Sequence, residues 1–318
     1  MSQTHIWWIR RDIRLHDNQT LEAALQSADH LLPLFIIEPE LMDEAAPKRR
    51  AFLLNALADL HRQLQNLGSQ LIVRRGPALD AFEGLSEALG EVIIFAHEDY
   101  SPFSRQRDEA VSDRFSLKTF PSVTLRHPNA VLKNDGDPYV VYTPYKNTWY
   151  EKPLPTPADC LPAPDSLPPL PEGISSQDLP SVEPLAEFPG TAKEAQGRLT
   201  EYIKDGIHYY QSRRDRMDLE GTSKLSPYLR FGLVSAREAF SQAQIASLQA
   251  KDDQDRAEIR TWMDELVWRE FYIAILYHFP DVMEGPFREK YQAVPWRNAP
   301  DDLQAWQEGK TGDRKSVV

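Results

Sequence analysis

Leu31-Leu-Pro-Leu-Phe-Ile-Ile37 is a run of seven residues without a charged or polar side chain. The first 125 residues contain three similar runs, which are His5-Ile-Trp-Trp-Ile9, Gln70-Leu-Ile-Val73 and Glu91-Val-Ile-Ile-Phe95. Each run is followed by an amphipathic helical pattern, such as Lys48 to Leu67. Short apolar strands alternating with helices are typical of a doubly wound parallel sheet that is buried on both faces. The sequence therefore predicts an α/β fold for this part of the chain.

Ligands of such sheets bind beyond the carboxyl ends of the strands. This rule makes the loops at residues 10–17 and 96–103 candidate walls of a binding site. No Gly-x-Gly-x-x-Gly follows the first strand, and no Walker phosphate loop is present. The sequence therefore gives no support for a nicotinamide dinucleotide site or a P-loop nucleotide site.

The composition changes in the middle of the chain. Residues 151–190 hold 11 of the 25 prolines, which disfavours helices and central strands and suits a long connector. Helical patterns then dominate, at 192–209, 225–248 and 257–279. We predict an α/β domain over residues 1–130, a proline-rich linker over 131–190 and a mainly α-helical, incomplete second domain over 191–318.

Charge and cysteine content narrow the class of protein. The formal net charge of −12 argues against indiscriminate coating of nucleic acid, which needs clustered lysine and arginine. The single cysteine, Cys160, excludes a disulfide framework and a cysteine-rich metal site, so we expect no metal. No stretch is long and apolar enough to span a bilayer. We expect a cytoplasmic monomer.

One segment, Glu220-Gly-Thr-Ser-Lys-Leu-Ser-Pro-Tyr-Leu-Arg-Phe-Gly232, has the composition of an anion site. Pro227 suits the first turn of a helix, and we predict that Ser226 caps it. Free backbone amides at this helix start, together with hydroxyl groups and Lys224, would cradle a pyrophosphate. A simple Ser-Pro helix cap with exposed neighbours explains the same pattern equally well.

A second segment, Trp262-Met-Asp-Glu-Leu-Val-Trp-Arg-Glu-Phe-Tyr272, places polar and aromatic residues on one helix face. The spacing aligns Trp262, Glu265, Arg269 and Tyr272, with Trp268 beside them. Such groups are costly to bury unless they meet a ligand or each other. An aromatic core stripe with a paired glutamate and arginine is the alternative. Upstream, the arginines of Tyr209-Tyr-Gln-Ser-Arg-Arg-Asp-Arg216 fit either phosphate binding or a solvated helix face.

Four separated motifs occur in the order found in the photolyase and cryptochrome family, which the chain resembles. The motifs are Trp7-Trp-Ile-Arg-Arg-Asp-Ile-Arg-Leu-His-Asp-Asn18, Gly221-Thr-Ser-Lys-Leu-Ser-Pro-Tyr-Leu229, Glu265-Leu-Val-Trp-Arg-Glu-Phe-Tyr272 and Ala305-Trp-Gln-Glu-Gly-Lys-Thr-Gly312. Among the members of this family, the chain is most similar to class I cyclobutane pyrimidine dimer photolyases. The resemblance implies a blue-light flavoprotein lyase that binds DNA containing pyrimidine dimers and splits a dimer by electron transfer from reduced FAD.

The resemblance also implies roles for individual residues. The cofactor FAD would be bound by Tyr210, Thr222, Ser223, Lys224, Leu225, Ser226 and Trp262. DNA would be bound by Arg214, Glu265, Trp268, Arg269 and Tyr272, with Glu265 and Trp268 meeting the extruded lesion. Trp306 would be the surface tryptophan of an electron relay. The loop and helix start at Tyr100-Ser-Pro-Phe-Ser-Arg-Gln-Arg-Asp108 would lie beside an antenna pigment, either a folate or a deazaflavin.

The sequence departs from the family pattern at its end, where Asp313-Arg-Lys-Ser-Val-Val318 replaces the expected continuation. We expect a helical domain truncated at its C-terminus and inefficient repair by these 318 residues. Two alternatives stay open: a cryptochrome-type light sensor without repair, and an inactive remnant in which only the α/β domain folds.

Overall fold

The structure is a computed structural model that describes residues 3–43, 45–121 and 123–312. By its internal contacts the chain divides into two compact units, Met1–His278 and Phe279–Val318. The predicted domain boundaries at residues 130 and 190 both fall inside the first unit, where one hydrophobic core includes residues from before and after the proline-rich stretch. The predicted division into three parts therefore stays a prediction.

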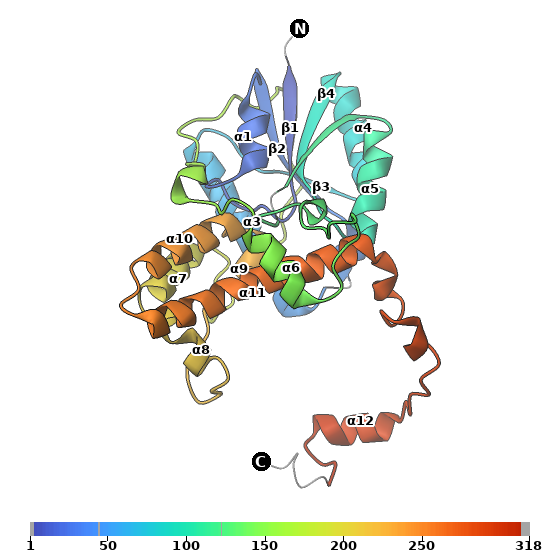
Figure 1. Cartoon of the computed structure of the whole chain (residues 1–318). Helices are drawn as coiled ribbons and strands as arrows, with labels where there is room; N and C mark the ends of the chain where they lie inside the picture. Colours follow the sequence, from blue (N-terminus) through green and yellow to red (C-terminus); the bar gives the residue numbers. More distant parts are fainter. Residues whose placement is uncertain (1–2, 44, 122, 313–318) are drawn as a thin grey trace. The chain divides into compact units, whose positions relative to one another are not determined.

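A five-stranded parallel sheet forms the α/β part of the first unit (Figure 1). Its order is β3-β2-β1-β4-β5, with bounds β1 Thr4–Ile9, β2 His30–Ile37, β3 Ile72–Arg75, β4 Val92–His97 and β5 Ser116–Phe120. The chain adds β2 and β3 on one side of β1 and then β4 and β5 on the other side. This order confirms the doubly wound parallel sheet and places the topological switch point between β1 and β4.

Helices cover both faces of the sheet. Successive residues of a strand point to opposite faces, and both Trp7 and Trp8 are buried. The core around Trp8 includes residues of α4 (Ala78–Leu89) and α5 (Pro102–Ser112). The core around Trp7 includes residues of α1 (Gln19–Leu25) and α3 (Pro47–Asn66) and continues into the helical part. A short helix, α2 (Pro39–Asp43), follows β2.

The helical part of the first unit is built from six helices of the described chain. Their bounds are α6 Tyr142–Tyr150, α7 Ala192–Lys204, α8 Tyr210–Arg213, α9 Ser226–Phe231, α10 Ala236–Leu248 and α11 Asp253–His278. The predicted helical run 225–248 is two helices, because Gly232 ends α9 with a φ of +73° and Ser235 begins α10 as its N-cap. The helix α6 lies within the expected linker and packs against α11 through Tyr142 and Trp268.

The proline-rich stretch behaves as its composition predicts. Within residues 151–190 the structure has one short 3-10 turn, Pro157–Asp159, and otherwise no regular elements. In the second unit the described elements are 3-10 turns at Pro280–Met283 and Glu289–Tyr291 and the helix α12 (Pro300–Gln307). The departing sequence Asp313–Val318 lies outside the described residues.

Candidate functional site

The helix α11 brings three of the predicted residues to one cavity. Trp262, Glu265 and Arg269 follow one another at intervals of three and four residues, so they point to the same side of the helix. All three line a cavity of about 500 Å³. Trp262 is only 4% exposed and its ring lies 5.7 Å from that of Tyr202.

The hydroxyl-rich segment before α9 forms another part of the same wall. Thr222, Ser223 and Ser226 line the cavity, and so does Tyr210 of α8. The prediction that Ser226 caps the helix is wrong: Leu225 is the N-cap residue, no side chain caps the helix, and Ser226 is its first residue. The reason is that Leu225 already has helical backbone angles, with φ −85° and ψ −6°, so the helix begins one residue early.

Two residues of this segment that the resemblance assigns to FAD binding, Lys224 and Leu225, do not line the cavity. Leu225 is 1% exposed and belongs to the hydrophobic core. Lys224 has a φ of +51°, and its ammonium group lies 2.5 Å from Glu220 and 3.9 Å from Glu187. The structure therefore places the predicted hydroxyl groups at the cavity and directs the predicted lysine to two carboxylates.

The carboxylate of Glu265 is already engaged within the site. The Arg214 guanidinium donates to Glu265 Oε1 at 2.6 Å, so Arg214 is paired with a protein carboxylate. Burial and the nearby negative charge of Glu265 raise the pKa of the Tyr210 hydroxyl, which stays protonated and can donate a hydrogen bond. Arg214, Glu265 and Tyr210 thus form one polar group at the cavity.

Arg269 is buried in the wall. Its guanidinium donates to the backbone carbonyls of Val123 at 2.6 Å and Leu229 at 3.5 Å. Burial, and then the positive charge of Arg11, lower its pKa to about 10, so it remains charged at neutral pH. The buried guanidinium belongs to a residue that lines the cavity. The contact of Arg269 with DNA, which the family resemblance implies, stays a prediction.

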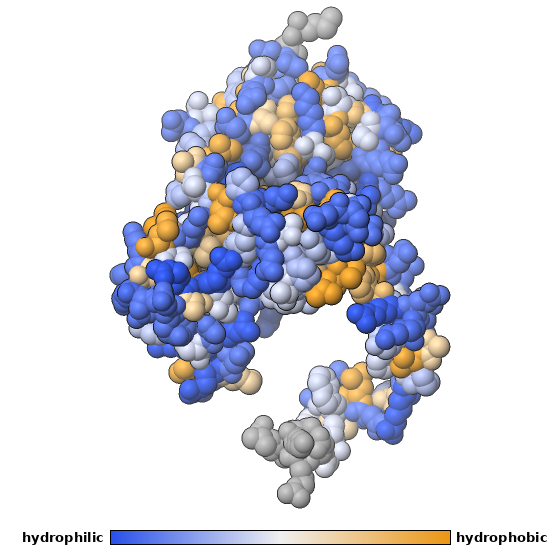
Figure 2. Space-filling model, in the orientation of Figure 1, coloured by the Kyte–Doolittle hydropathy of each residue, from blue (hydrophilic) through white to orange (hydrophobic). Residues whose placement is uncertain are grey.

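Trp268 and Tyr272 lie outside this cavity. The ring of Trp268 stacks on Tyr142 of α6, with centroids 3.4 Å apart and planes 10° apart, and lies 5.6 Å from Tyr272. Tyr272 is 64% exposed. Figure 2 shows apolar side chains gathered beside α6 and α11. Val140 and Val141, which directly precede α6, are also exposed. The structure therefore separates this aromatic surface from Trp262 and Glu265, which line the cavity.

Trp306 lies in the second unit. It belongs to α12, the last helix of the described chain, and is 66% exposed. This exposure matches a surface position, as the family resemblance implies. Its predicted role in an electron relay stays a prediction.

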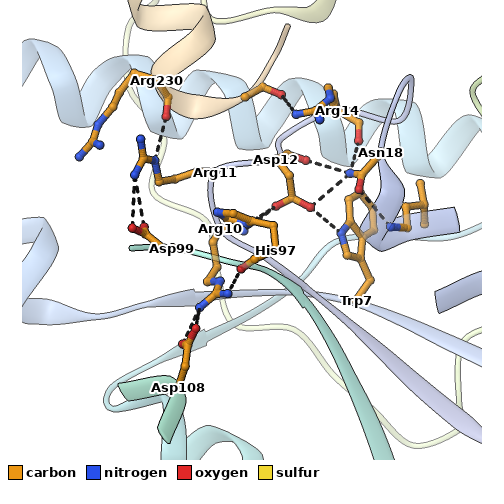
Figure 3. Close-up of polar contacts among 12 residues, drawn as sticks. Trp7, Arg10, Arg11, Asp12, Arg14, Asn18, His97, Asp99, Asp108 and Arg230 are labelled. Atoms are coloured by element: carbon orange, nitrogen blue, oxygen red, sulfur yellow. Dashed lines mark hydrogen bonds and ion pairs between the residues drawn. The ribbon is translucent and has the colours of Figure 1, made fainter. Parts of the chain in front are cut away.

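Sequence reasoning missed two arginines of the cavity, Arg11 and Arg230. Arg11 belongs to the loop after β1, which the sheet rule did single out, and it lies between Asp99 and the Arg230 carbonyl (Figure 3). No sequence signal indicates Arg230, which lies in the last turn of α9. The sequence of a helix does not show which neighbouring segments its side chains face.

A buried carboxylate fixes the loop that carries Arg11. Asp12 accepts hydrogen bonds from Trp7 Nε1 and the Arg10 amide, each at 3.0 Å, and from Asn18 at 3.2 Å (Figure 3). Burial alone would raise the pKa of Asp12, but His97, the Arg10 amide and Trp7 together hold it well below its usual range. The loop after β1 is therefore held rigidly at the edge of the sheet.

A second cavity, of about 350 Å³, lies in the α/β part. It is lined by residues that follow β2 and β3 and by the start of α5, including Glu38, Pro77, Phe103 and Arg107. Arg107 donates to Glu38 at 2.6 Å, and burial raises the pKa of Glu38. Part of the segment Tyr100–Asp108, which the resemblance places beside an antenna pigment, lines this cavity.

Glu270 lies on α11, and its carboxyl group is buried. It is 1% exposed and accepts hydrogen bonds from Trp149 Nε1 at 2.8 Å and from the Leu125 amide. Burial raises its pKa from the ordinary 4.5 to about 7, although the two donors oppose the shift. The carboxyl group thus links α6, the loop after β5 and α11.

This shift predicts a pH-dependent stability. Between about pH 4.5 and 7 the folded state keeps the Glu270 proton that the unfolded chain releases, so the stabilisation present at low pH is lost as pH rises. We expect the unfolding free energy of the wild type, relative to Glu270→Gln, to fall by up to about 3 kcal/mol across this window. Urea unfolding of both proteins at several pH values measures it, and a constant difference would contradict it.

Comparisons with known proteins agree with this architecture. Residues 5–165 match the family model described as DNA photolyase, and residues 262–313 match the FAD binding domain of DNA photolyase. A deoxyribodipyrimidine photo-lyase from Synechococcus sp. is 33% identical over 98% of this chain and 68% of its own length. The chain belongs to the DNA photolyase family. It spans about two thirds of the length of this relative.

Solved structures of the family have the same fold. A bacterial class III photolyase from Agrobacterium tumefaciens matches with a TM-score of 0.85 and 25% identity, over 97% of this chain and 66% of that chain. A cryptochrome from Synechocystis sp. matches with a TM-score of 0.83 and 21% identity, over 98% of this chain and 68% of that chain. The photolyase-type α/β sheet followed by a helical FAD-binding region is thus the fold of this family member.

The described part of the chain lacks a membrane-spanning helix and a cluster of metal ligands. None of its helices combines the length and the apolar character that crossing a membrane requires. Among the same residues, no group of three or more histidine, cysteine, aspartate or glutamate side chains is arranged to hold a metal ion.

Proposed function

We propose that the cavity beside α11 holds FAD and that the chain serves light-driven repair of cyclobutane pyrimidine dimers in DNA. One observation carries the proposal: residues from three separated segments that resemblance assigns to FAD or the lesion line a single cavity. They are Tyr210, Thr222, Ser223, Ser226, Trp262 and Glu265. The reaction class is that of a carbon–carbon lyase, deoxyribodipyrimidine photo-lyase.

The residues of the cavity fit the chemistry of the cofactor. A volume of about 500 Å³ is within the range of small-molecule sites. Three hydroxyl groups can donate hydrogen bonds to phosphate oxygens, and Trp262 offers an aromatic surface to a planar ring. FAD, when bound and reduced, supplies the light-excited electron that splits a dimer.

The protein's own groups would bind and orient the substrate. Glu265 can accept hydrogen bonds from the base edges of an extruded dimer, after it exchanges its present bond to Arg214. The exposed ring of Tyr272, stacked on Trp268, offers a base-stacking surface outside the cavity. Released from Glu265, the Arg214 guanidinium can pair with a DNA phosphate.

The second cavity is where we propose an antenna pigment. Phe103 offers a ring surface there, and Gln106 and Arg107 offer hydrogen-bond donors. A planar pigment would suit this combination, because flat apolar surfaces contribute affinity and a few polar groups fix orientation. Extraction of pigment from the purified protein, followed by mass spectrometry, identifies whether a folate or a deazaflavin is bound.

Replacement of Trp262 by alanine tests the cavity as the FAD site. We expect an affinity for FAD about tenfold weaker than that of the wild type, because an aromatic contact of about 1.4 kcal/mol is lost. The measurement is quenching of flavin fluorescence on titration with protein. Trp262→Phe keeps an aromatic ring and should lose less affinity.

The matched control is Trp296→Ala, because Trp296 is 76% exposed and lies in the second unit. Equal FAD affinities for Trp262→Ala and Trp296→Ala would contradict the assignment of the cavity. Repair is tested separately, by illuminating the reduced, FAD-loaded protein with DNA that contains dimers. Loss of dimers only in the light supports repair, whereas bound FAD without repair favours the light sensor, the function class of the cryptochrome with the same fold.

A further inference from the structure

The helix α6 packs against α11 and places three side chains on it (Figure 1). Tyr142, Lys146 and Tyr150 are each four residues apart, so they lie on one side of α6. We call these three residues the α6 stripe. The ring of Tyr142 stacks on Trp268, with centroids 3.4 Å apart and planes 10° apart. The proposed function uses Trp268 but no residue of the stripe.

One carboxylate of α11, that of Asp264, holds the other two residues of the stripe. The Lys146 ammonium lies 2.7 Å from Asp264 Oδ2, and the Tyr150 hydroxyl donates to Asp264 Oδ1 at 2.9 Å. Arg260, one turn earlier on α11, lies 3.3 Å from the same carboxylate, and its guanidinium lies over the ring of Tyr150. These contacts fix the position of α6 along α11.

Tyr142 is fixed at both ends of its side chain. Its ring lies against the Trp268 indole, and its hydroxyl donates to the backbone carbonyl of Asp264 at 2.9 Å. In an α-helix the carbonyl of residue 264 also accepts from the amide of residue 268. The hydroxyl is therefore held on the helical turn that leads to Trp268. Rotation of the indole away from its present orientation would break the stack.

We propose that Tyr142 is a positioning residue, which holds the ring of Trp268 in one orientation so that a base of the DNA substrate can stack on this aromatic surface. The inference rests on the proposed function, in which Trp268 and Tyr272 offer that surface. Trp268 is half-buried and Tyr272 is 64% exposed, so part of the surface stays open. A ring that is ordered before binding avoids the cost of being ordered by the substrate.

The test measures binding of a labelled oligonucleotide that contains one pyrimidine dimer. Fluorescence anisotropy is recorded in the dark with the full chain supplied with FAD, and an undamaged oligonucleotide of the same sequence is the reference. We expect Tyr142→Leu to bind the dimer about three to ten times more weakly than the wild type, which is the cost of ordering one side chain on binding. Tyr142→Phe keeps the stacked ring and should retain most of the affinity.

The matched control is Tyr139→Leu, which also removes one ring contact and one hydrogen bond. Tyr139 is half-buried just before α6, its ring lies 6.3 Å from that of Tyr145, and its hydroxyl lies 2.8 Å from the Thr148 hydroxyl. We expect this variant to bind the dimer as the wild type does. Urea unfolding of both leucine variants separates a loss of positioning from a loss of folding.

A double-mutant cycle shows whether Tyr142 acts through Trp268. Trp268→Leu alone should weaken dimer binding about tenfold, because a base-stacking surface is lost. If Tyr142 only positions Trp268, the double variant Tyr142→Leu, Trp268→Leu should bind no more weakly than Trp268→Leu.

Two results would overturn the positioning role alone: equal dimer affinities of Tyr142→Leu and Tyr139→Leu, or a double variant that shows the full sum of both losses. In either case a wild type that prefers the dimer, together with weaker binding by Trp268→Leu, leaves the proposed function in place. A wild type that binds damaged and undamaged DNA equally contradicts the proposed function, and the positioning role with it.

Discussion

Replacement of Gly232 by alanine is expected to lower the free energy of unfolding by about 4 kcal/mol or more. Gly232 has a φ of +73°, which disfavours any side chain, and it approaches the loop after β1 closely. A Cβ atom there would lie 1.9 Å from the Arg11 carbonyl oxygen and 2.9 Å from the Asp12 Cα. Both obstacles are backbone atoms, and the buried carboxylate of Asp12 holds this loop in place.

Urea unfolding followed by circular dichroism measures this effect. Gly84→Ala is the matched control, because Gly84 is exposed within α4 and an added Cβ would meet nothing within 4 Å. We expect that control to gain about 0.5–1 kcal/mol, since alanine favours a helix interior. A cost below 1 kcal/mol for Gly232→Ala would show that α9 and the loop after β1 do not meet as described.

Replacement of Asp17 by alanine should cost about 3–5 kcal/mol, because it leaves the Arg237 charge without its buried partner. The Asp17 carboxylate is completely buried. It accepts hydrogen bonds from the Ser235 hydroxyl, from Arg237 Nε at 3.0 Å and from the Leu161 amide at 3.1 Å. One side chain thus connects the α/β part, the proline-rich stretch and α10.

Asp17→Asn separates charge from shape in the same unfolding experiment. Asparagine tolerates the φ of +49° at this position and keeps one oxygen acceptor, so we expect a smaller loss than for alanine. Equal losses for the two variants would contradict the role of the side-chain hydrogen bonds. Losses below 1 kcal/mol for both would contradict the role of the buried ion pair.

The sequence predicts four strands of the sheet because each is a short apolar run buried on both faces. It does not predict β5, because Ser116-Leu-Lys-Thr-Phe120 is polar and largely exposed at the edge of the sheet. The helical periodicity of the sequence also predicts one helix over 225–248, where the structure has the two helices α9 and α10. The close approach of Gly232 to Arg11, which breaks that run, involves residues 221 positions apart in the sequence, so no local pattern shows it.

The helical face of α11 is predicted correctly for Trp262, Glu265 and Arg269, because their spacing alone places them together. The spacing cannot show that Tyr142, from the expected linker, covers one face of Trp268. It also cannot show that Arg230 points into the cavity. Both facts depend on how distant segments pack, and no pattern within α6 or α9 encodes that packing.

The visible absorption spectrum of the purified protein after reconstitution with FAD tests the central claim most directly. If the cavity beside α11 is a flavin site, the protein elutes yellow from gel filtration, with FAD in near-equal molar ratio to the chain. A colourless protein that unfolds cooperatively, and is therefore folded, would contradict the claim that this cavity holds FAD.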